Sequence, residues 1–177
     1  MPTLMPHRLS PAKSTRLYTE EERARRDATI WTLIQGLLAP AQFLVFAVSC
    51  VLVVRYLATG EGYAIATWSI LIKTGFLYVI MITGAIWEKV VFGQYLFAPA
   101  FFWEDVVSFL VIGLHTAYLW ALFTNALDPA SLMHLALAAY ATYVINAGQF
   151  LWKLRRARLD IEREATQQQP AQQQVAA

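Results

Sequence analysis

The feature that most constrains the fold is a long run of residues, 28–54, that contains no charged side chain. A helix rises 1.5 Å per residue, so about 20 apolar residues cross the roughly 30 Å hydrocarbon layer of a bilayer. With 58% hydrophobic residues and a mean hydropathy of +0.44, the 177-residue chain carries more apolar surface than a soluble domain of this size buries. The sequence therefore predicts an all-α integral membrane protein.

Three further apolar runs predict three more transmembrane helices, at about 64–87, 102–123 and 131–152. Between the second and third spans lies the aromatic stretch Trp87–Asp105, whose apolar interior from Val90 to Trp103 is too short to span and is broken by Gly93 and Pro99. This pattern favours an aromatic interfacial loop at headgroup level. We expect a polar N-terminal segment (1–27), a four-helix transmembrane domain (28–154) and a basic, then Gln-rich, disordered tail (155–177).

Charge distribution predicts the orientation. Lysine and arginine gather before the first span and after the last. Because these residues favour the cytoplasmic side, both termini are predicted to be cytoplasmic, which agrees with an even number of spans. In the N-terminal segment, Thr19 followed by Glu22 predicts a capping box at the start of a short surface helix.

Composition also excludes several function classes. A net charge of +2, with its basic residues in two terminal clusters, argues against a nucleic-acid partner. The single cysteine, Cys50, allows neither a disulfide framework nor a Cys-based zinc site. The sequence contains no zinc signature, phosphate-binding glycine loop, nucleophile elbow or dinucleotide fingerprint, so we expect no cofactor.

Carboxylates at the two ends of the aromatic stretch are the candidate catalytic residues. They are Glu88, Glu104 and Asp105, each next to or near a tryptophan. At the edge of a low-dielectric cavity, desolvation and mutual repulsion favour a protonated acid beside an ionised base. The alternative is structural: Glu88 lies at a hydrated helix end, and Glu104 and Asp105 complement the dipole at a helix N-terminus.

Helical geometry groups further candidates. Glu104 and His115 are eleven positions apart and so lie within about 20° of each other, with Ser108 and Tyr118 close to the same line. Asn146 lies on a polar face of the fourth span. Lys73, near the middle of the second span, requires an interior partner or a wet cavity, and either a structural or a functional role satisfies that requirement.

Several motifs together resemble the 3-vinyl bacteriochlorophyllide hydratase family of phototrophic bacteria, over roughly 16–160. The motifs are Arg55-Tyr56-Leu57, Thr59-Gly60-Glu61-Gly62-Tyr63, Ser69-Ile70, Lys73-Thr74, Ile86-Trp87-Glu88-Lys89, the run from Leu96 to Asp105, and His115-Thr116-Ala117-Tyr118. The resemblance implies a lyase that adds water across the C3 vinyl group of chlorophyllide a to give the 3-(1-hydroxyethyl) product, with no cofactor. It also implies a multi-pass protein of the bacterial inner membrane.

The resemblance turns the candidates into hypotheses about substrate binding. Flat surfaces for the macrocycle would come from Trp87, Phe101, Phe102 and Trp103. His115 would be a ligand to the substrate magnesium, and Lys73 or Lys89 would bind the propionate. Chlorophyllide a, water and the lipid bilayer are the expected partners, whereas contacts with other bacteriochlorophyll-biosynthesis enzymes and a homo-oligomer remain open. Two rival functions also remain: a non-catalytic pigment carrier or assembly subunit, and a small transporter.

Overall fold

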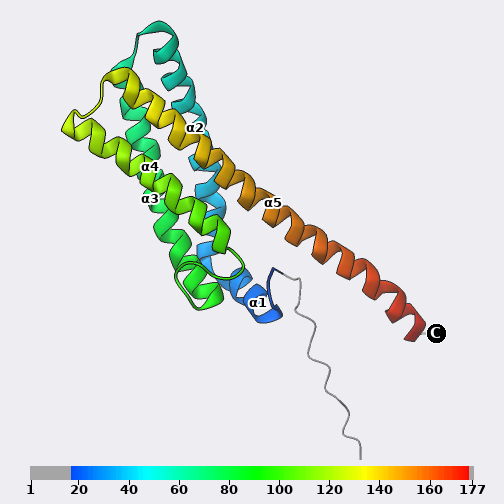
Figure 1. Cartoon of the computed structure of the whole chain (residues 1–177). Coiled ribbons are helices and arrows are strands. Elements are labelled where there is room, and N and C mark those ends of the chain that lie inside the picture. The colour runs from blue at the N-terminus through cyan, green and yellow to red at the C-terminus, as the bar shows by residue number, and fades with distance from the viewer. Residues whose placement is uncertain (1–16, 176–177) are drawn as a thin grey trace, which may run out of the picture.

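The computed structural model describes residues 17–175, and the side chains of all of these except 160, 161 and 163–175. Within these residues the chain forms five α-helices and no strand, as Figure 1 shows. The helices are α1 (Glu20–Ala28), α2 (Ile30–Thr59), α3 (Tyr63–Phe92), α4 (Phe102–Thr124) and α5 (Pro129–Val175). The prediction of an all-α protein is confirmed.

Four of the helices are long and apolar enough to cross a membrane: α2, α3, α4 and the part of α5 from Pro129 to Leu159. Their outward faces carry large hydrophobic side chains, and Leu37, Val51 and Trp68 are each more than half exposed. Contiguous apolar surface of this kind is rare on soluble monomers and is the expected surface in lipid. The four predicted spans are therefore confirmed, although α3 extends to Phe92, beyond its predicted end at Trp87.

Glycines end two of the spanning helices. Gly60 follows α2 with φ +74°, and Gly93 follows α3 with φ +84°, a left-handed conformation that glycine adopts without a Cβ clash. The Gly60 amide donates to the carbonyl of Tyr56, and the Gly93 amide donates to that of Lys89. These bonds satisfy carbonyl groups that have no partner within the helix.

Side-chain caps begin α1 and α5. In the predicted capping box, which is confirmed, the Glu22 amide donates to Thr19 Oγ1 at 3.2 Å and the Thr19 amide donates to Glu22 Oε2 at 2.8 Å. Asp128 Oδ1 accepts from the amides of Ala130 and Ser131 at the start of α5. Hydrogen bonds from Ser131 hold the pKa of Asp128 below its usual range.

The helices pack mainly in two pairs, α2 with α3 and α4 with α5, and α2 also contacts α5. Buried side chains from all four spans meet in one core, which includes Val53, Ile70, Tyr118, Met133 and Ala136. Small residues such as Ala136 let membrane helices approach closely, because in lipid it is packing that holds helices together.

The elements around the candidate site gather at one end of the bundle. Figure 1 shows α1 beside the loop 93–101 that joins α3 to α4, and α5 leaves the bundle toward the same end. Arg25 Nε of α1 donates to the carbonyl of Val91 at 2.8 Å. The short turns at 60–62 and 125–128 lie at the other end. That the end with α1 is cytoplasmic, and that loop 93–101 is interfacial, stay predictions.

The last helix is longer than the fourth predicted span, because the structure continues α5 to Val175. Glutamine, alanine, glutamate and arginine have good helix propensity, and a helix that is already nucleated extends at low cost. The disorder predicted from 155 onward stays a prediction. Residues 1–16 and 176–177, which belong to the predicted terminal segments, lie outside the described residues.

Candidate active site

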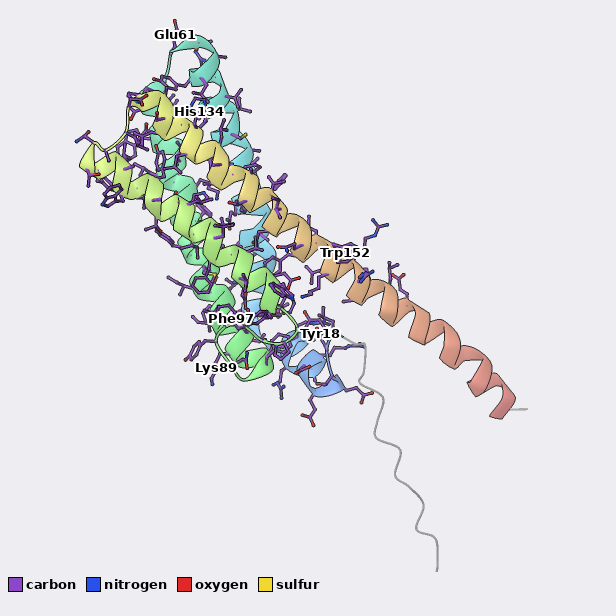
Figure 2. All side chains as sticks on the ribbon, in the orientation of Figure 1. Tyr18, Glu61, Lys89, Phe97, His134 and Trp152 are labelled. Atoms are coloured by element: carbon purple, nitrogen blue, oxygen red, sulfur yellow. The ribbon has the colours of Figure 1, made fainter. Side chains whose placement is uncertain are left out.

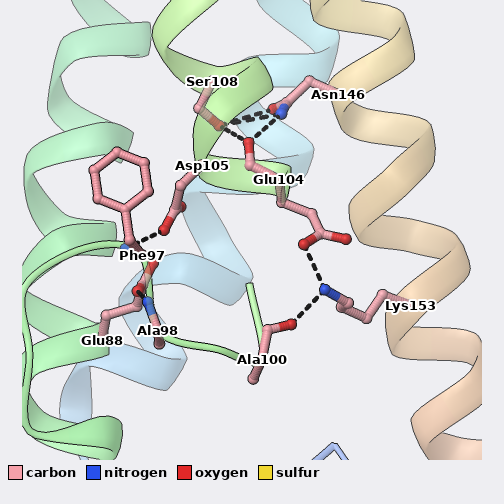
Figure 3. A network of polar contacts seen from close by, with 9 residues as sticks. All are labelled: Glu88, Phe97, Ala98, Ala100, Glu104, Asp105, Ser108, Asn146 and Lys153. Carbon is pink, nitrogen blue, oxygen red and sulfur yellow. Dashed lines mark hydrogen bonds and ion pairs between the residues drawn. The ribbon is translucent and has the colours of Figure 1, made fainter. Parts of the chain in front are cut away.

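Two carboxyl groups from different helices converge under the loop between α3 and α4. Glu88 lies in the last turns of α3, Asp105 lies in the first turn of α4, and both are buried. The Phe97 amide donates to Asp105 Oδ2 at 2.6 Å, and the next amide, that of Ala98, donates to Glu88 Oε2 at 3.2 Å (Figure 3). Consecutive amides of one loop therefore hold a carboxyl pair side by side.

The loop achieves this arrangement through an unusual backbone conformation. Phe97 has φ +59°, in the left-handed region that non-glycine residues rarely adopt. At this point the chain turns the exposed Phe97 ring outward and the fully buried Ala98 inward. The bond to Asp105 compensates part of the cost of the left-handed backbone, which is about 1–2 kcal/mol.

The third carboxylate, Glu104, has a different partner. It forms a charge-assisted bond with Lys153 Nζ of α5, which also donates to the carbonyl of Ala100 (Figure 3). The ammonium group lies 5.0 Å from the centre of the Phe101 ring. Glu104 is therefore ion-paired, whereas Glu88 and Asp105 accept hydrogen bonds from loop amides.

Ser108 and Asn146 fix this part of α4 against α5. Ser108 Oγ donates to the carbonyl of Glu104 at 2.8 Å, and Asn146 Nδ2 donates to the same carbonyl at 2.9 Å. Asn146 Nδ2 also lies 3.1 Å from Ser108 Oγ (Figure 3). Both predicted residues thus belong to the carboxylate end of the bundle, and their contacts hold the α4 backbone in place.

The predicted aromatic residues separate into an interior set and an outer set. Trp87 and Phe101 pack in the interior, with ring centroids 5.7 Å apart, and Phe101 stacks on Phe150 at 5.8 Å. Phe102 and Trp103 point away from the bundle and are 43% and 68% exposed. The interior rings pack against one another, whereas each outer ring has one side exposed on the surface of the bundle.

Lys73 and His115 form a second polar centre deep in the bundle. Lys73 Nζ lies 2.7 Å from His115 Nε2, and His115 Nδ1 lies 2.8 Å from the carbonyl of Val111. Because a carbonyl only accepts, Nδ1 carries the proton and Nε2 accepts from Lys73. Asp105 and His115 are ten residues apart on α4, which is about 15 Å. This centre is separate from the carboxylates, and both ring nitrogens of His115 have hydrogen-bond partners.

Two predicted residues lie away from the carboxyl pair. Lys89 is exposed, and its Nζ donates to the carbonyl of Gly93 at 2.7 Å and lies 5.4 Å from the Tyr95 ring centre. Figure 2 places Lys89 at the same end of the bundle as Phe97. Tyr118 is fully buried in the core nearer the opposite end.

Sequence reasoning did not identify Lys153 or Phe97. A signal for Lys153 was present, because it follows Asn146 by seven residues and so lies on the same helix face, two turns on. No sequence signal marks Phe97, whose role depends on a backbone conformation that only the folded loop imposes.

The amino-acid sequence is similar to that of named proteins. The family model described as 2-vinyl bacteriochlorophyllide hydratase matches residues 18–156. The chain is 78% identical over 152 residues to the 2-vinyl bacteriochlorophyllide hydratase of Cereibacter sphaeroides, covering 85% of this chain and 94% of the relative. It is 74% identical over 157 residues to the protein of the same name from Rhodobacter capsulatus, covering 88% and 91%. No solved structure matches the chain significantly.

Proposed function

This chain belongs to the 2-vinyl bacteriochlorophyllide hydratase family, and on that basis we propose that it adds water across the C3 vinyl group of chlorophyllide a. The product is the 3-(1-hydroxyethyl) derivative. We take the 2-vinyl group of the relatives' names to be the group on the carbon numbered C3 here. The observation that carries the proposal is the carboxyl pair, Glu88 and Asp105, held by consecutive loop amides.

The pair divides into an acid and a base. Asp105 accepts the shorter bond, 2.6 Å from the Phe97 amide, and such a bond favours its ionised form. Glu88 accepts a longer bond of 3.2 Å from the Ala98 amide, which supports a negative charge less well. We assign Glu88 as the general acid and Asp105 as the general base.

Proton transfers balance within the pair. Glu88 gives its proton to the terminal vinyl carbon, which becomes a methyl group, and the macrocycle delocalises the positive charge left on the carbon next to the ring. The oxygen of water bonds to that carbon, and Asp105 accepts the proton that the water loses. Transfer of this proton from Asp105 to Glu88 restores the starting state, so the net change is the addition of one water molecule.

The remaining charged residues have supporting roles in this proposal. Glu104 forms an ion pair with Lys153 that ties the first turn of α4 to α5. Lys89, exposed at the same end, is the better candidate for the substrate propionate, because Lys73 lies fifteen residues from Glu88 along α3, about 22 Å. His115 is not used as a magnesium ligand, since Lys73 occupies its Nε2.

The relatives' names favour catalysis over the rival of a passive pigment carrier. The four apolar helices support a multi-pass protein. We place it in the bacterial cytoplasmic or intracytoplasmic membrane, with the carboxylate end facing the cytoplasm.

Hydration by single variants tests the assignment. Membranes containing the full chain are incubated with chlorophyllide a, and loss of the conjugated vinyl group is followed as a blue shift in absorption. We expect Glu88→Gln and Asp105→Asn each to lower the hydration rate by about 100-fold or more, the usual contribution of a general acid or base. Glu104→Gln lowers it less, because Glu104 transfers no proton. Glu61→Gln, exposed at the opposite end, is the control.

Two outcomes reject different parts of the proposal. Near-normal hydration by both Glu88→Gln and Asp105→Asn rejects the carboxyl pair as the acid and base. Absence of hydration by the wild-type chain, in membranes where it is folded, rejects the function itself.

A further inference from the structure

We propose that the macrocycle of the substrate docks from the lipid side onto an outward-facing surface formed by Phe97, Phe102 and Phe109. We call these three side chains the aromatic face. The vinyl edge of the docked ring then lies at Asp105. The inference rests on the proposed function and identifies where its substrate binds.

The α4 helix places Asp105 at the edge of the aromatic face. Phe102 and Phe109 are seven residues apart, so they lie within about 20° of each other around the helix, and they are 43% and 45% exposed. Asp105 lies between them in sequence, within about 40–60° of both, and is only 3% exposed. Its carboxyl group is therefore at the boundary between the outer rings and the buried polar site.

The loop completes the face with Phe97. The Phe97 ring stacks on Phe109 with a centroid distance of 5.4 Å and an interplanar angle of 10°, and it lies 5.6 Å from Phe102. The backbone of Phe97 is left-handed, and its amide donates to Asp105. The same residue thus contributes a ring to the surface and a hydrogen bond to the proposed base. Strain stored at such a position is typical of functional sites.

The interior aromatic cluster cannot serve instead. Trp87 and Phe101 contact Phe92, Tyr18 and Phe150 at centroid distances between 5.7 and 6.3 Å. A flat macrocycle would have to displace these rings. The aromatic face is open, borders the carboxyl pair and faces the phase into which an apolar macrocycle partitions. The occupant that fits is therefore the chlorin ring.

Exposed aromatic residues also occur in membrane proteins as interfacial anchors. An anchoring role predicts that the rings affect association with lipid and leave substrate affinity unchanged. A docking role predicts the opposite. The two roles are thus separated by a steady-state measurement on protein that is already in a bilayer.

The experiment compares Phe109→Ala with a matched control in the full chain, purified and reconstituted in nanodiscs. Chlorophyllide a is titrated, and kcat and KM for hydration are measured. We expect KM to rise about tenfold and kcat to change less than twofold, because the ring contributes binding rather than chemistry. Phe123→Ala is the control, since Phe123 is 73% exposed at the other end of the same helix. Its KM should equal that of the wild type.

Two further variants separate docking from folding. Phe109→Leu keeps apolar volume but removes the flat ring, and we expect a raised KM at an unchanged Tm. Phe97→Gly removes the ring and relieves the left-handed backbone, and we expect a raised KM without a loss of Tm. Unchanged KM in Phe109→Leu and Phe97→Gly, with normal hydration by the wild type, overturns the docking site and leaves the proposed function standing. So does a defect confined to nanodisc incorporation, which identifies the rings as lipid anchors.

Discussion

Single residues decide what each carboxylate in the site can do. Glu104 has a counter-charge in Lys153, so its negative charge is compensated inside the bundle. Glu88 and Asp105 instead accept hydrogen bonds from consecutive amides of the loop. Helix periodicity groups Glu104 with His115. Contacts between helices, however, give Glu104 a different partner from those of Glu88 and Asp105. The pairing of Glu88 with Asp105 thus depends on their tertiary contacts and not on their spacing in the sequence.

Removal of the Lys153 charge tests this division. Lys153→Met keeps the alkyl stem and leaves Glu104 buried without its counter-charge, so we expect the free energy of unfolding to fall by about 2 kcal/mol. The double variant Lys153→Met/Glu104→Gln removes the uncompensated charge and should recover more than half of that loss. Denaturant unfolding in micelles measures both.

The control for this pair is Arg155→Met, because Arg155 is exposed on the same helix. It should leave stability within about 0.5 kcal/mol of the wild type. Simple additivity of the Lys153 and Glu104 single variants in the double variant would show that the two side chains are not coupled.

At the scale of elements, α1 covers the carboxylate end of the bundle. Tyr18, just before α1, is 3% exposed and stacks on Phe92 of α3 at a centroid distance of 5.8 Å. Burial raises the pKa of Tyr18 to about 12, although the nearby Arg26 opposes the shift. The short surface helix is therefore docked through a neutral phenol, which must lose its proton to become charged.

A pH dependence of α1 docking follows from this burial. The pKa of Tyr18 is higher in the folded than in the unfolded chain. Its contribution to the free energy of unfolding is therefore fully present below pH 10 and is lost as the pH rises toward 12. Two pKa units correspond to about 2.7 kcal/mol as an upper bound. We expect the Tm of the wild type to fall more between pH 10 and 12 than that of Tyr18→Phe, which keeps the ring. Parallel declines in the two proteins would contradict the assignment.

At the scale of the whole molecule, four spans bring α1, loop 93–101 and the emerging part of α5 to one end of the bundle (Figure 1). The acids, Lys89 and Lys153 all lie there. The positive-inside pattern predicts that this end is cytoplasmic. A substrate held at the aromatic face would then be accessible from the cytoplasmic leaflet.

Cysteine accessibility in spheroplasts tests this orientation. In a background in which Cys50 is replaced by alanine, Glu61→Cys and Gln94→Cys mark the two ends of the bundle. A membrane-impermeant maleimide should label Glu61→Cys from outside, and Gln94→Cys only after lysis. Labelling of Gln94→Cys in intact spheroplasts would place the site on the periplasmic side.

The sequence alone determined the features that depend on local pattern. Uncharged runs predicted four spans, a three-residue spacing predicted the Thr19–Glu22 capping box, and the 100° rotation per residue placed Glu104 and His115 on one buried face. Each of these follows from the hydropathy or periodicity of a single segment. Local pattern therefore sufficed for the helices and for the candidate acids.

Only the tertiary structure decided which side chains meet. Lys153 of α5 forms an ion pair with Glu104 of α4, and Lys73 Nζ of α3 lies within hydrogen-bond distance of His115 Nε2 of α4. The packing of α3, α4 and loop 93–101 decides which aromatic rings lie inside the bundle and which face outward. These contacts depend on the rotation and crossing of whole helices, to which every packed residue contributes. Phe97 shows this most clearly, because its left-handed backbone is held by Asp105 and by ring stacking on Phe109, eight and twelve residues away.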